Sequence, residues 1–472
     1  MISLHDIALL RPEIILAAGA VIVMFGIAVK RNAAFSNILT LIIFVLAFIF
    51  VLQPTAGREY ISGLFVVDGL GSYLSVIIIA AAFIITLFSY PYFKIQTETK
   101  EEFYILLILA TLGSVCMVIS NHFISFVLSL ELLSVSLFSL IGYLKNKKVS
   151  IEAAIKYLIM AAVATSFVLF GFALIYAETG NMDLQGISEN LQDQPPGMLV
   201  VAGLALSIVG FGFKMALVPF HFWTPDIYAG APAPVSAFVA TISKGAAFIF
   251  LLRLFYSVGG LSQNGIWIAF AVLATASMFI GNWLALRQQN IKRLLAYSSI
   301  SHLGYLMVAF LSFSEPGIRA ASFYLLVYFV SMLAAFGLIT YFSGKKGEPM
   351  MVEDYRGLFW SKPWLAAFFT LVMFSLAGIP FSAGFMGKFY ILASGMNSGP
   401  VFLLIVLVVS STIGLFYYLR VVAVMLSRTG SVLTGYIGKR SLILKILLII
   451  LFLLMIWFGT WPAPVLDWMA AF

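Results

Sequence analysis

Charged residues are scarce in this sequence, and their scarcity decides the class of protein. Asp, Glu, Lys and Arg together make up 10% of the 472 residues, whereas 62% of the residues are hydrophobic. A soluble globular protein would carry about a quarter charged residues. The mean hydropathy of +1.08 points the same way. The composition therefore excludes an ordinary soluble protein and indicates a chain that crosses a lipid bilayer many times.

Cysteine is almost absent as well. Cys116 is the single cysteine, which excludes an intrachain disulfide and any iron–sulfur or zinc site built from several cysteines. The phosphate-binding pattern G-x-x-x-x-G-K-[ST] does not occur, and no set of histidines and acids has convincing metal-ligand spacing. We therefore expect no cofactor and no metal in this chain. Any redox or ATP-driven step coupled to it would take place in other subunits.

Long apolar runs are abundant. A helix needs roughly 20 apolar residues to cross the hydrocarbon layer. Fourteen runs approach or exceed this length, at approximately 12–29, 33–52, 70–90, 102–120, 122–143, 151–177, 198–222, 232–256, 264–286, 291–312, 317–342, 363–394, 399–426 and 441–461. We therefore predict an all-α polytopic membrane protein with about 14 transmembrane helices. The two longest connections, 178–197 and 343–362, are predicted to be solvated loops.

The lysines and arginines between these runs are distributed unevenly. One set of alternate loops holds 17 of the 27 lysines and arginines, namely Lys30, Arg31, Lys94, Lys100, Lys145, Lys147, Lys148, Arg287, Lys292, Arg293, Lys345, Lys346, Arg356, Lys362, Arg428, Lys439 and Arg440. The other set holds Arg11, Arg58 and Arg319, together with the acidic loop at 178–193. This positive-inside pattern predicts that both termini lie on the non-cytoplasmic side. The net charge of +8 thus reflects membrane orientation, and we expect no nucleic-acid partner.

Two of the runs contain helix-breaking residues close to a lysine. Pro219 follows Lys214, and Pro380 precedes Lys388. Unwound backbone at membrane depth is tolerated only where it is buried in protein or lines a water-filled cavity. Paired interruptions in corresponding positions are typical of transporters built from inverted repeats, and they point to the transport site.

This spacing divides the chain into four parts. We predict two inverted repeats of five helices, at 101–256 and 257–426, each with one broken helix. Residues 1–100 would form an N-terminal segment of three helices, and 427–472 a C-terminal helix.

Four charged side chains lie well inside apolar runs, away from the run ends: Glu131, Lys214, Lys244 and Lys388. A charged side chain near the bilayer centre costs roughly 2.5–3.5 kcal/mol on insertion scales, so such residues usually mark ion pathways and proton relays. Lys244 is the most central, about 18 Å from either end of its run by helix rise. Simpler roles exist for the others, because Ser134 could hold a neutral Glu131, and either remaining lysine could bind carbonyl groups freed by a helix break.

Three further residues have weaker signals. Lys156 lies five residues into its run, where a lysine that snorkels to the interface is as plausible as a functional one. His302 shares a helical face with Ser298 and Tyr305, which could support a water chain or simply packing. His221 beside Pro219 could be a gate, although a structural bond to a freed carbonyl group is favoured.

Other cations inside the runs lie towards the run ends. Arg253, Arg420 and Lys445 are there, and we predict that these three side chains snorkel.

Lysine chemistry suits a relay. Burial generally lowers the pKa of a lysine and a nearby carboxylate raises it, so moving one partner can make the amine take or release a proton near neutral pH.

Three segments resemble a known family: GFKMALVPFHFWTPD at 212–226, NIKRLLAYSSISH at 290–302, and LAGIP followed by GKFY between 376 and 390. In these segments and along essentially the whole chain, the sequence resembles the antiporter-like membrane subunits of respiratory complex I, the NADH:quinone oxidoreductase. The resemblance places a switching pair at Glu131 and Lys156. It places a relay of buried lysines at Lys214, Lys244 and Lys388.

The resemblance implies a proton-translocating subunit of the bacterial inner membrane, coupled to quinone reduction in neighbouring subunits. Its partners would be the other antiporter-like and small membrane-arm subunits, together with protons and the lipid bilayer. The same framework occurs in subunits of Mrp-type cation/proton antiporters, which leaves a second function open. A third alternative is a structural subunit that does not pump.

The predicted orientation can be tested by thiol labelling. Cysteines introduced in the loop at 145–148 and in the acidic loop at 178–193 should differ in access to a membrane-impermeant reagent added to intact cells. We expect labelling only in the acidic loop, because the basic loop is predicted to be cytoplasmic. Labelling at 145–148 would contradict the orientation.

Overall fold

The computed structural model describes residues 3–53, 57–96, 100–192, 196–259, 264–344, 347–398, 401–428 and 442–470. The helices are α1 (Leu4–Leu9), α2 (Arg11–Val29), α3 (Ala33–Val51), α4 (Gly69–Gln96), α5 (Glu102–Val118), α6 (Phe123–Ile141), α7 (Lys148–Thr179), α8 (Leu184–Gln192), α9 (Met198–Met215), α10 (Trp223–Gly230), α11 (Ala233–Phe238), α12 (Lys244–Ser257), α13 (Asn264–Leu286), α14 (Ile291–Leu311), α15 (Glu315–Phe342), α16 (Leu358–Ser361), α17 (Pro363–Ala377), α18 (Ala383–Ser398), α19 (Val401–Leu426), α20 (Leu442–Thr460) and α21 (Ala463–Ala470). A π-helix, η1 (Val239–Ser243), joins α11 to α12, and a 3₁₀-helix, η3 (Val352–Tyr355), precedes α16. Strands β1 (Glu59–Ile61) and β2 (Phe65–Val67) form an antiparallel hairpin.

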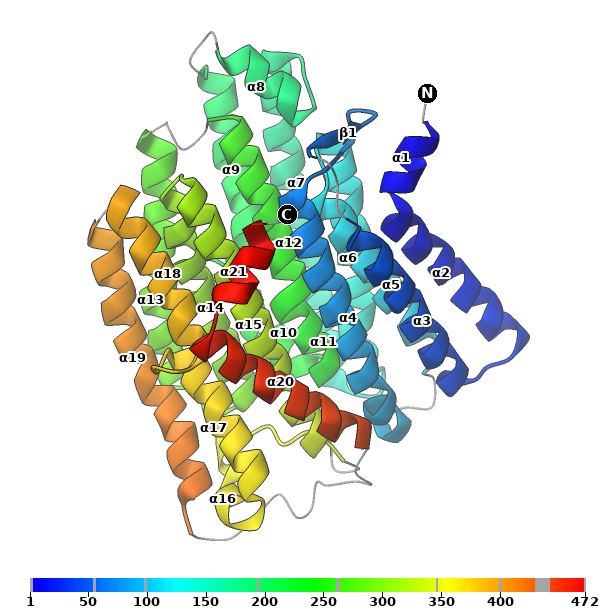
Figure 1. The fold of residues 1–472 in the computed structure, drawn as a ribbon, viewed down its shortest axis with the longest axis vertical. Coiled ribbons are helices and arrows are strands. Elements are labelled where there is room, and N and C mark those ends of the chain that lie inside the picture. The colour runs from blue at the N-terminus through cyan, green and yellow to red at the C-terminus, as the bar shows by residue number, and fades with distance from the viewer. Residues whose placement is uncertain are drawn as a thin grey trace.

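Most of the helices run side by side along one axis of the molecule (Figure 1). Within the described part of the chain, twelve helices are long and apolar enough to cross a membrane, counting Ala233–Ser257 as one continuous helix. The shorter apolar helices α5 and α17 lie within two further predicted spans. An all-α polytopic membrane protein is therefore confirmed. The count of fourteen spans, the inverted symmetry and the four-part division stay predictions.

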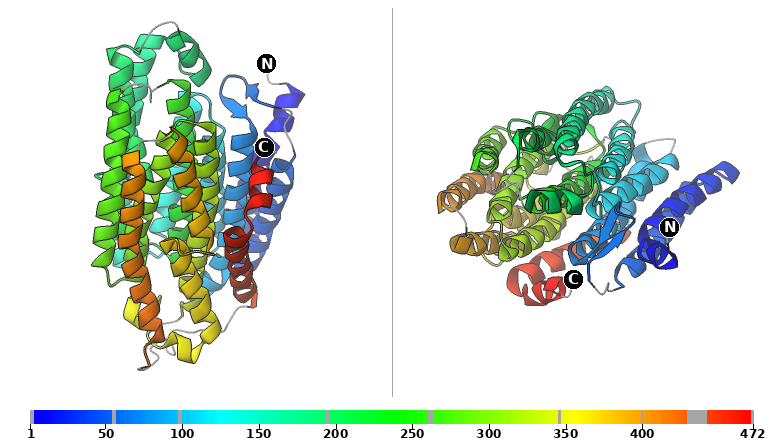
Figure 2. Two further views of the ribbon diagram at one scale, coloured as in Figure 1. Left: turned by 60° about the vertical axis from the view of Figure 1, so that its left-hand side comes forward. Right: turned by 90° about the horizontal axis from the view of Figure 1, so that it is seen from above.

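The centre of the bundle is formed by α12, α14 and α15. The most apolar window of Ala233–Ser257 is entirely buried, and the windows of α14 and α15 are 94% buried. In contrast, α2 and α3 stand at one edge and α19 at the opposite edge (Figure 2). Helices with a single buried face lie outside, and the helices that carry polar residues on several faces lie inside.

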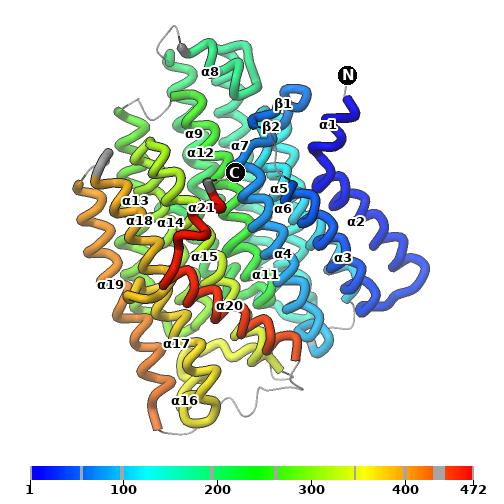
Figure 3. The backbone as a smooth tube through the Cα atoms, viewed as in Figure 1, coloured from blue at the N-terminus to red at the C-terminus, as the bar shows by residue number. Residues whose placement is uncertain are grey.

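Both predicted helix breaks are present. Helix α9 ends at Met215, where Ala216 adopts a left-handed conformation with φ of 60°, and α10 resumes at Trp223. Helix α17 ends at Ala377, and α18 begins beyond it and lies above α17 in Figure 3. Each break exposes carbonyl groups of the preceding helix to a polar partner.

Several connections contain structure that the sequence did not predict. The β1–β2 hairpin packs where only a loop was expected, and α8 lies within the acidic segment 178–197. The segment 343–362 was predicted to be solvated, which is wrong in part, because Glu348 within it is buried and bonded. Of the charged loop residues used to predict orientation, Asp193, Lys345, Lys346, Lys439 and Arg440 lie outside the described residues.

Arg253 does not snorkel, contrary to the prediction. Its side chain is 7% exposed and binds Asp68 through two bonds, Nη1 to Oδ2 at 2.8 Å and Nη2 to Oδ1 at 2.5 Å. Its Nε donates to the carbonyl oxygen of Val118 at 2.9 Å. The pair therefore joins α12 and the end of α5 to the residue that precedes α4. Burial opposes ionisation of Asp68, but the Arg253 guanidinium outweighs burial and holds the pKa of that carboxyl below its usual value.

Asp68→Asn should destabilise the chain in a pH-dependent way. The lowered pKa of Asp68 means that the pair stabilises the fold above the usual carboxyl range and stops doing so as pH falls through the folded pKa. Because removing one partner strands a buried charge, we expect a loss of about 3–5 kcal/mol at neutral pH. Thermal unfolding of the full chain in detergent would measure it. Glu189→Gln, which changes an exposed acid, is the matched control. Equal stability of the parental protein, Asp68→Asn and Glu189→Gln at neutral pH would contradict a stabilising role of the Arg253–Asp68 pair.

Candidate functional site

Lys244 occupies the most enclosed position among the predicted site residues. It begins α12 directly after the π-helix η1, and its side chain is fully buried. The Nζ atom donates to Ser299 Oγ on α14 at 2.6 Å and lies 5.4 Å from the centre of the Tyr228 ring. Single π-turns inside α-helices often occur at functional sites. No carboxylate of the described residues forms an ion pair with Lys244.

The hydroxyl that holds Lys244 is part of a small polar cluster. Ser299 Oγ also bonds to the Tyr328 hydroxyl at 2.6 Å and to the Tyr228 hydroxyl at 3.2 Å. These groups can donate and accept hydrogen bonds, so the cluster satisfies either the ammonium or the neutral amine.

Lys214 lies at the end of α9, just before the first helix break, and is 4% exposed. Its Nζ donates to Ser134 Oγ on α6 at 2.9 Å and to the Tyr157 hydroxyl on α7 at 3.0 Å. Glu131 is three residues before Ser134, on the same side of α6 by helix geometry. Glu131 is partly exposed.

Lys156 has different partners from those implied by the resemblance. Its Nζ pairs with Glu152 at 2.7 Å and with Asp226 of α10 at 2.8 Å. Arg293 of α14 binds the other oxygen of Asp226 at 2.8 Å. Among the residues that the structure describes, no ion pair joins Lys156 to Glu131.

Lys388 binds the break between α17 and α18. Its Nζ donates to the carbonyl oxygens of Leu376 at 3.1 Å and Ala377 at 2.8 Å, and to Ser411 Oγ at 2.8 Å. Lys388 therefore does bind freed carbonyl groups, as one of the two interpretations predicted. Gly378 makes this approach possible, because its φ is +83° and a Cβ there would lie 2.9 Å from Lys388 Cδ.

His302 lies between the central and the terminal lysine. Three residues before it on α14, Ser299 binds Lys244, and three residues after it, the Tyr305 ring lies 5.1 Å from Lys388 Nζ. Its Nδ1 bonds to the Tyr324 hydroxyl at 2.6 Å and its Nε2 to the Tyr418 hydroxyl at 3.1 Å. Ser298, one turn earlier on the same face, also bonds to the Tyr418 hydroxyl. The predicted polar face of α14 is thus present, and tyrosines from α15 and α19 complete it.

His221 remains the least defined of the predicted residues. It is 3% exposed, it lies beside the Phe222 ring, and its Nδ1 has no hydrogen-bond partner in the described part of the chain. Its proposed roles as gate or as structural bond stay predictions.

An ion pair near one end of α14 was missed. Lys292, which was counted among the loop cations, is fully buried and pairs with Glu348 at 2.9 Å. Glu348 also accepts bonds from the Tyr92 hydroxyl at 2.6 Å and from the amide of Ala233, the first residue of α11, at 2.8 Å. Burial opposes ionisation of Glu348, and the Lys292 charge outweighs it, so its pKa is lowered. The partners are 56 residues apart in sequence, so spacing alone could not reveal them.

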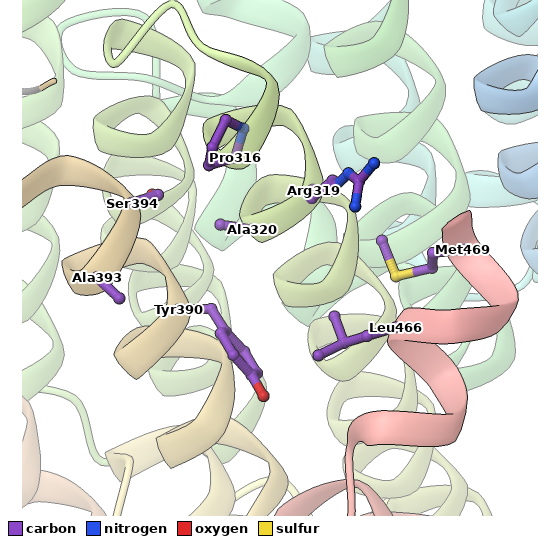
Figure 4. Close-up of a pocket in the computed structure, with 8 residues that line it drawn as sticks. All are labelled: Pro316, Arg319, Ala320, Tyr390, Ala393, Ser394, Leu466 and Met469. Atoms are coloured by element: carbon purple, nitrogen blue, oxygen red, sulfur yellow. The ribbon is translucent and has the colours of Figure 1, made fainter. Parts of the chain in front are cut away.

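The polar contacts of the buried lysines and of His302 thus lie inside the bundle and not at its surface. A surface cavity of about 320 Å³ lies between α15, α18 and α21, with Tyr390, Leu466 and Met469 facing it (Figure 4). Its lining is mainly apolar, and Arg319 at its edge pairs with Glu315 at 2.7 Å. None of the predicted site residues lines it.

Broken helices, together with buried lysines that form no ion pair, are typical of polytopic membrane proteins that move ions. The transmembrane family described as NADH:quinone oxidoreductase/Mrp antiporter matches residues 120–414. The chain belongs to this family.

Three solved structures are similar over nearly the whole chain. Respiratory complex I from Thermus thermophilus with bound aureothin contains a chain with 31% identity and a TM-score of 0.83, covering 98% of this chain and 99% of that one. An archaeal membrane-bound sulfane sulfur reductase complex gives 24% identity, a TM-score of 0.84, and coverage of 99% and 96%. The Mrp complex from Dietzia sp. DQ12-45-1b gives 18% identity, a TM-score of 0.86, and coverage of 99% and 97%. The last two likenesses concern the fold alone.

Proposed function

We propose that this chain is the N-type, proton-translocating membrane subunit of a bacterial NADH:quinone oxidoreductase. The observation that carries the proposal is the row of buried basic side chains formed by Lys214, Lys244, His302 and Lys388, none of which forms an ion pair with a described acid. The quinone chemistry would take place in neighbouring subunits, because this chain is expected to bind no cofactor.

The row is suited to proton transfer because each lysine contacts groups that tolerate both of its protonation states. Hydroxyl oxygens accept from an ammonium group and donate to a neutral amine. In the described residues, Lys244 is linked to Tyr328 through Ser299, and His302 to Tyr324 and Tyr418. Direct hydrogen bonds do not join the lysines to one another, so we propose that water molecules carry the proton between these clusters.

Two features favour the N-type reading over its alternatives. The similar chain at 31% identity belongs to a complex I structure, whereas the Mrp complex matches at 18%. Complex I contains several antiporter-like subunits, named L, M and N. The resemblance separates two of them at position 388, where M-type subunits usually have a glutamate, so Lys388 fits the N type. An Mrp-type antiporter subunit is the second candidate. Purified partners decide between them, because peripheral flavin and iron–sulfur subunits indicate complex I, and only small membrane subunits indicate an antiporter.

Lys244→Ala should abolish proton translocation while leaving assembly intact. Losing a positioned acid–base group typically costs roughly 10²-fold or more in rate, and alanine removes a side chain that makes a single described hydrogen bond. Proton uptake into vesicles containing the whole complex would measure the loss. Lys445→Ala, at an outer helix, is the matched control. Pumping at the parental rate in Lys244→Ala would contradict the relay.

The Glu131 and Lys156 switch needs a movement in this structure. Lys156 is held by Asp226 and Glu152, so we propose that it leaves Asp226 when it approaches Glu131. Its side chain is 43% exposed, which gives it room to change partner. Asp226 keeps a second cation, Arg293, when Lys156 departs. The movement of Lys156 would then change the charge near Lys214, and Asp226 would still be paired with Arg293.

Glu131→Gln tests this switch by removing charge and keeping shape. Glutamine retains the volume and can hydrogen-bond, but it cannot attract an ammonium group as a carboxylate does. We expect normal assembly, with coupled proton pumping and quinone reduction reduced at least about tenfold, and partial activity in Glu131→Asp. The comparison variant Asp226→Asn should keep more activity than Glu131→Gln, because it removes one of the acids that hold Lys156 and so lets Lys156 approach Glu131. Parental pumping in Glu131→Gln would show that Glu131 is structural.

A further inference from the structure

A second cavity, with polar residues in its lining, lies apart from the lysine row. It measures about 320 Å³ and is lined by residues of α1, α2, β1, β2 and α4, together with the end of α3 and single residues that follow α3 and α5. Among them are Glu13, Ser72 and Ser75, with His5 and Glu59 near the N-terminal helix. Figure 1 shows α1, the start of α2 and β1 gathered at the end of the bundle that also carries α8.

Two buried oxygen atoms in this cavity lack partners. Glu13 Oε2 and Ser75 Oγ are both inaccessible to solvent, and neither has a hydrogen-bond partner in the structure. Ser75 is 1% exposed. A buried serine of a helix usually returns its hydroxyl to the carbonyl group four residues earlier, as Ser89 does to Ile85. Ser75 makes no such bond and instead lines the cavity that Glu13 also lines.

The charged neighbours of Glu13 are engaged elsewhere. Arg11 donates to Gln53 Oε1 at 3.3 Å, and its guanidinium lies 5.6 Å from the centre of the Phe50 ring. His5 Nε2 bonds to Glu59 Oε2 at 2.6 Å. Among the described residues, therefore, no cation pairs with the Glu13 carboxylate.

A carboxylate buried with an unpartnered oxygen is strongly unfavourable unless something neutralises it. The two available solutions are a proton on the carboxyl group or a hard cation between its oxygen and the nearby hydroxyl. Carboxylate and hydroxyl oxygens are ligands for such cations, whereas soft metals prefer sulfur and nitrogen. Glu13 and Ser75 line the same cavity, and Glu13 Oε2 and Ser75 Oγ do not bond to each other. A ligand held in this cavity would supply the partner that each oxygen lacks.

We propose that this cavity is a binding site for a small monovalent cation, H⁺ or Na⁺, with Glu13 as the charged ligand and Ser75 as the neutral one. The site lies on α2 and α4, outside residues 120–414 that match the family. It shares no residue with the lysine row, and its occupancy can be measured without proton pumping.

Binding to the purified full chain distinguishes the two cations. Equilibrium dialysis with ²²Na⁺ should show saturable binding that is lost in Glu13→Gln and weakened severalfold in Ser75→Ala. If the ligand is H⁺, the infrared spectrum should contain a protonated carboxyl band that disappears in Glu13→Gln and does not respond to Na⁺. Glu189→Gln, at an exposed acid of α8, is the control and should match the parental protein in both measurements.

Either of these losses supports the site. If Glu13→Gln binds ²²Na⁺ as the parental chain does and also keeps the whole carboxyl band, the cavity holds only water and the proposal is overturned. Ser75→Ala guards against misfolding, since it removes one buried oxygen without touching the charge. Parental ²²Na⁺ binding in Ser75→Ala, together with loss in Glu13→Gln, would exclude the shared site and leave Glu13 acting alone.

Discussion

The interior of this protein depends on how it accommodates ammonium groups that have no acid beside them. Moving a charge out of water is costly, and proteins usually offset the cost with an opposite charge. Here Lys214, Lys244 and Lys388 receive hydroxyl oxygens, carbonyl oxygens and tyrosine ring faces instead. Such partners lower the cost of the ammonium form, and the hydroxyl groups among them can also bond to a neutral amine. A carboxylate at the same distance would hold the proton in place.

The break between α17 and α18 follows from that constraint, whereas Lys214 at the first break binds hydroxyl groups of α6 and α7. An intact α-helix uses its carbonyl groups internally, so a lysine inside a bundle finds few free acceptors. Ending α17 at Ala377 frees two carbonyl oxygens, and both accept from Lys388. Gly378 is needed at this point, because a side chain in the left-handed conformation would be strained and would also press on Lys388. The helix break at Gly378 and the binding of Lys388 therefore depend on each other, although these residues are ten positions apart in the sequence.

Sequence reasoning succeeded wherever the signal was local. Apolar run length predicted the spans, Pro219 and Pro380 predicted the breaks, and isolated lysines within apolar runs predicted the buried row. It failed where the partner lies far along the chain. Arg253 near a run end looked like a snorkelling residue until Asp68 was found beside it, and Lys292 looked like a loop cation until Glu348 was found. The tyrosines that surround His302 were missed for the same reason, since α15 and α19 supply them.

The cations of the molecule thus fall into two groups with different physical roles. Arg253 and Lys292 are buried beside acids whose lowered pKa keeps these acids ionised, which favours fixed ion pairs between helices. The lysines of the central row lack such acids, and hydroxyl or carbonyl groups contact them instead. Lys156 belongs to neither group, because it is half exposed and shares Asp226 with Arg293. Lys156 can leave Asp226 without leaving this acid unpaired, so it is suited to transmit a change of charge to the buried lysines. A fully buried ion pair would resist such a movement.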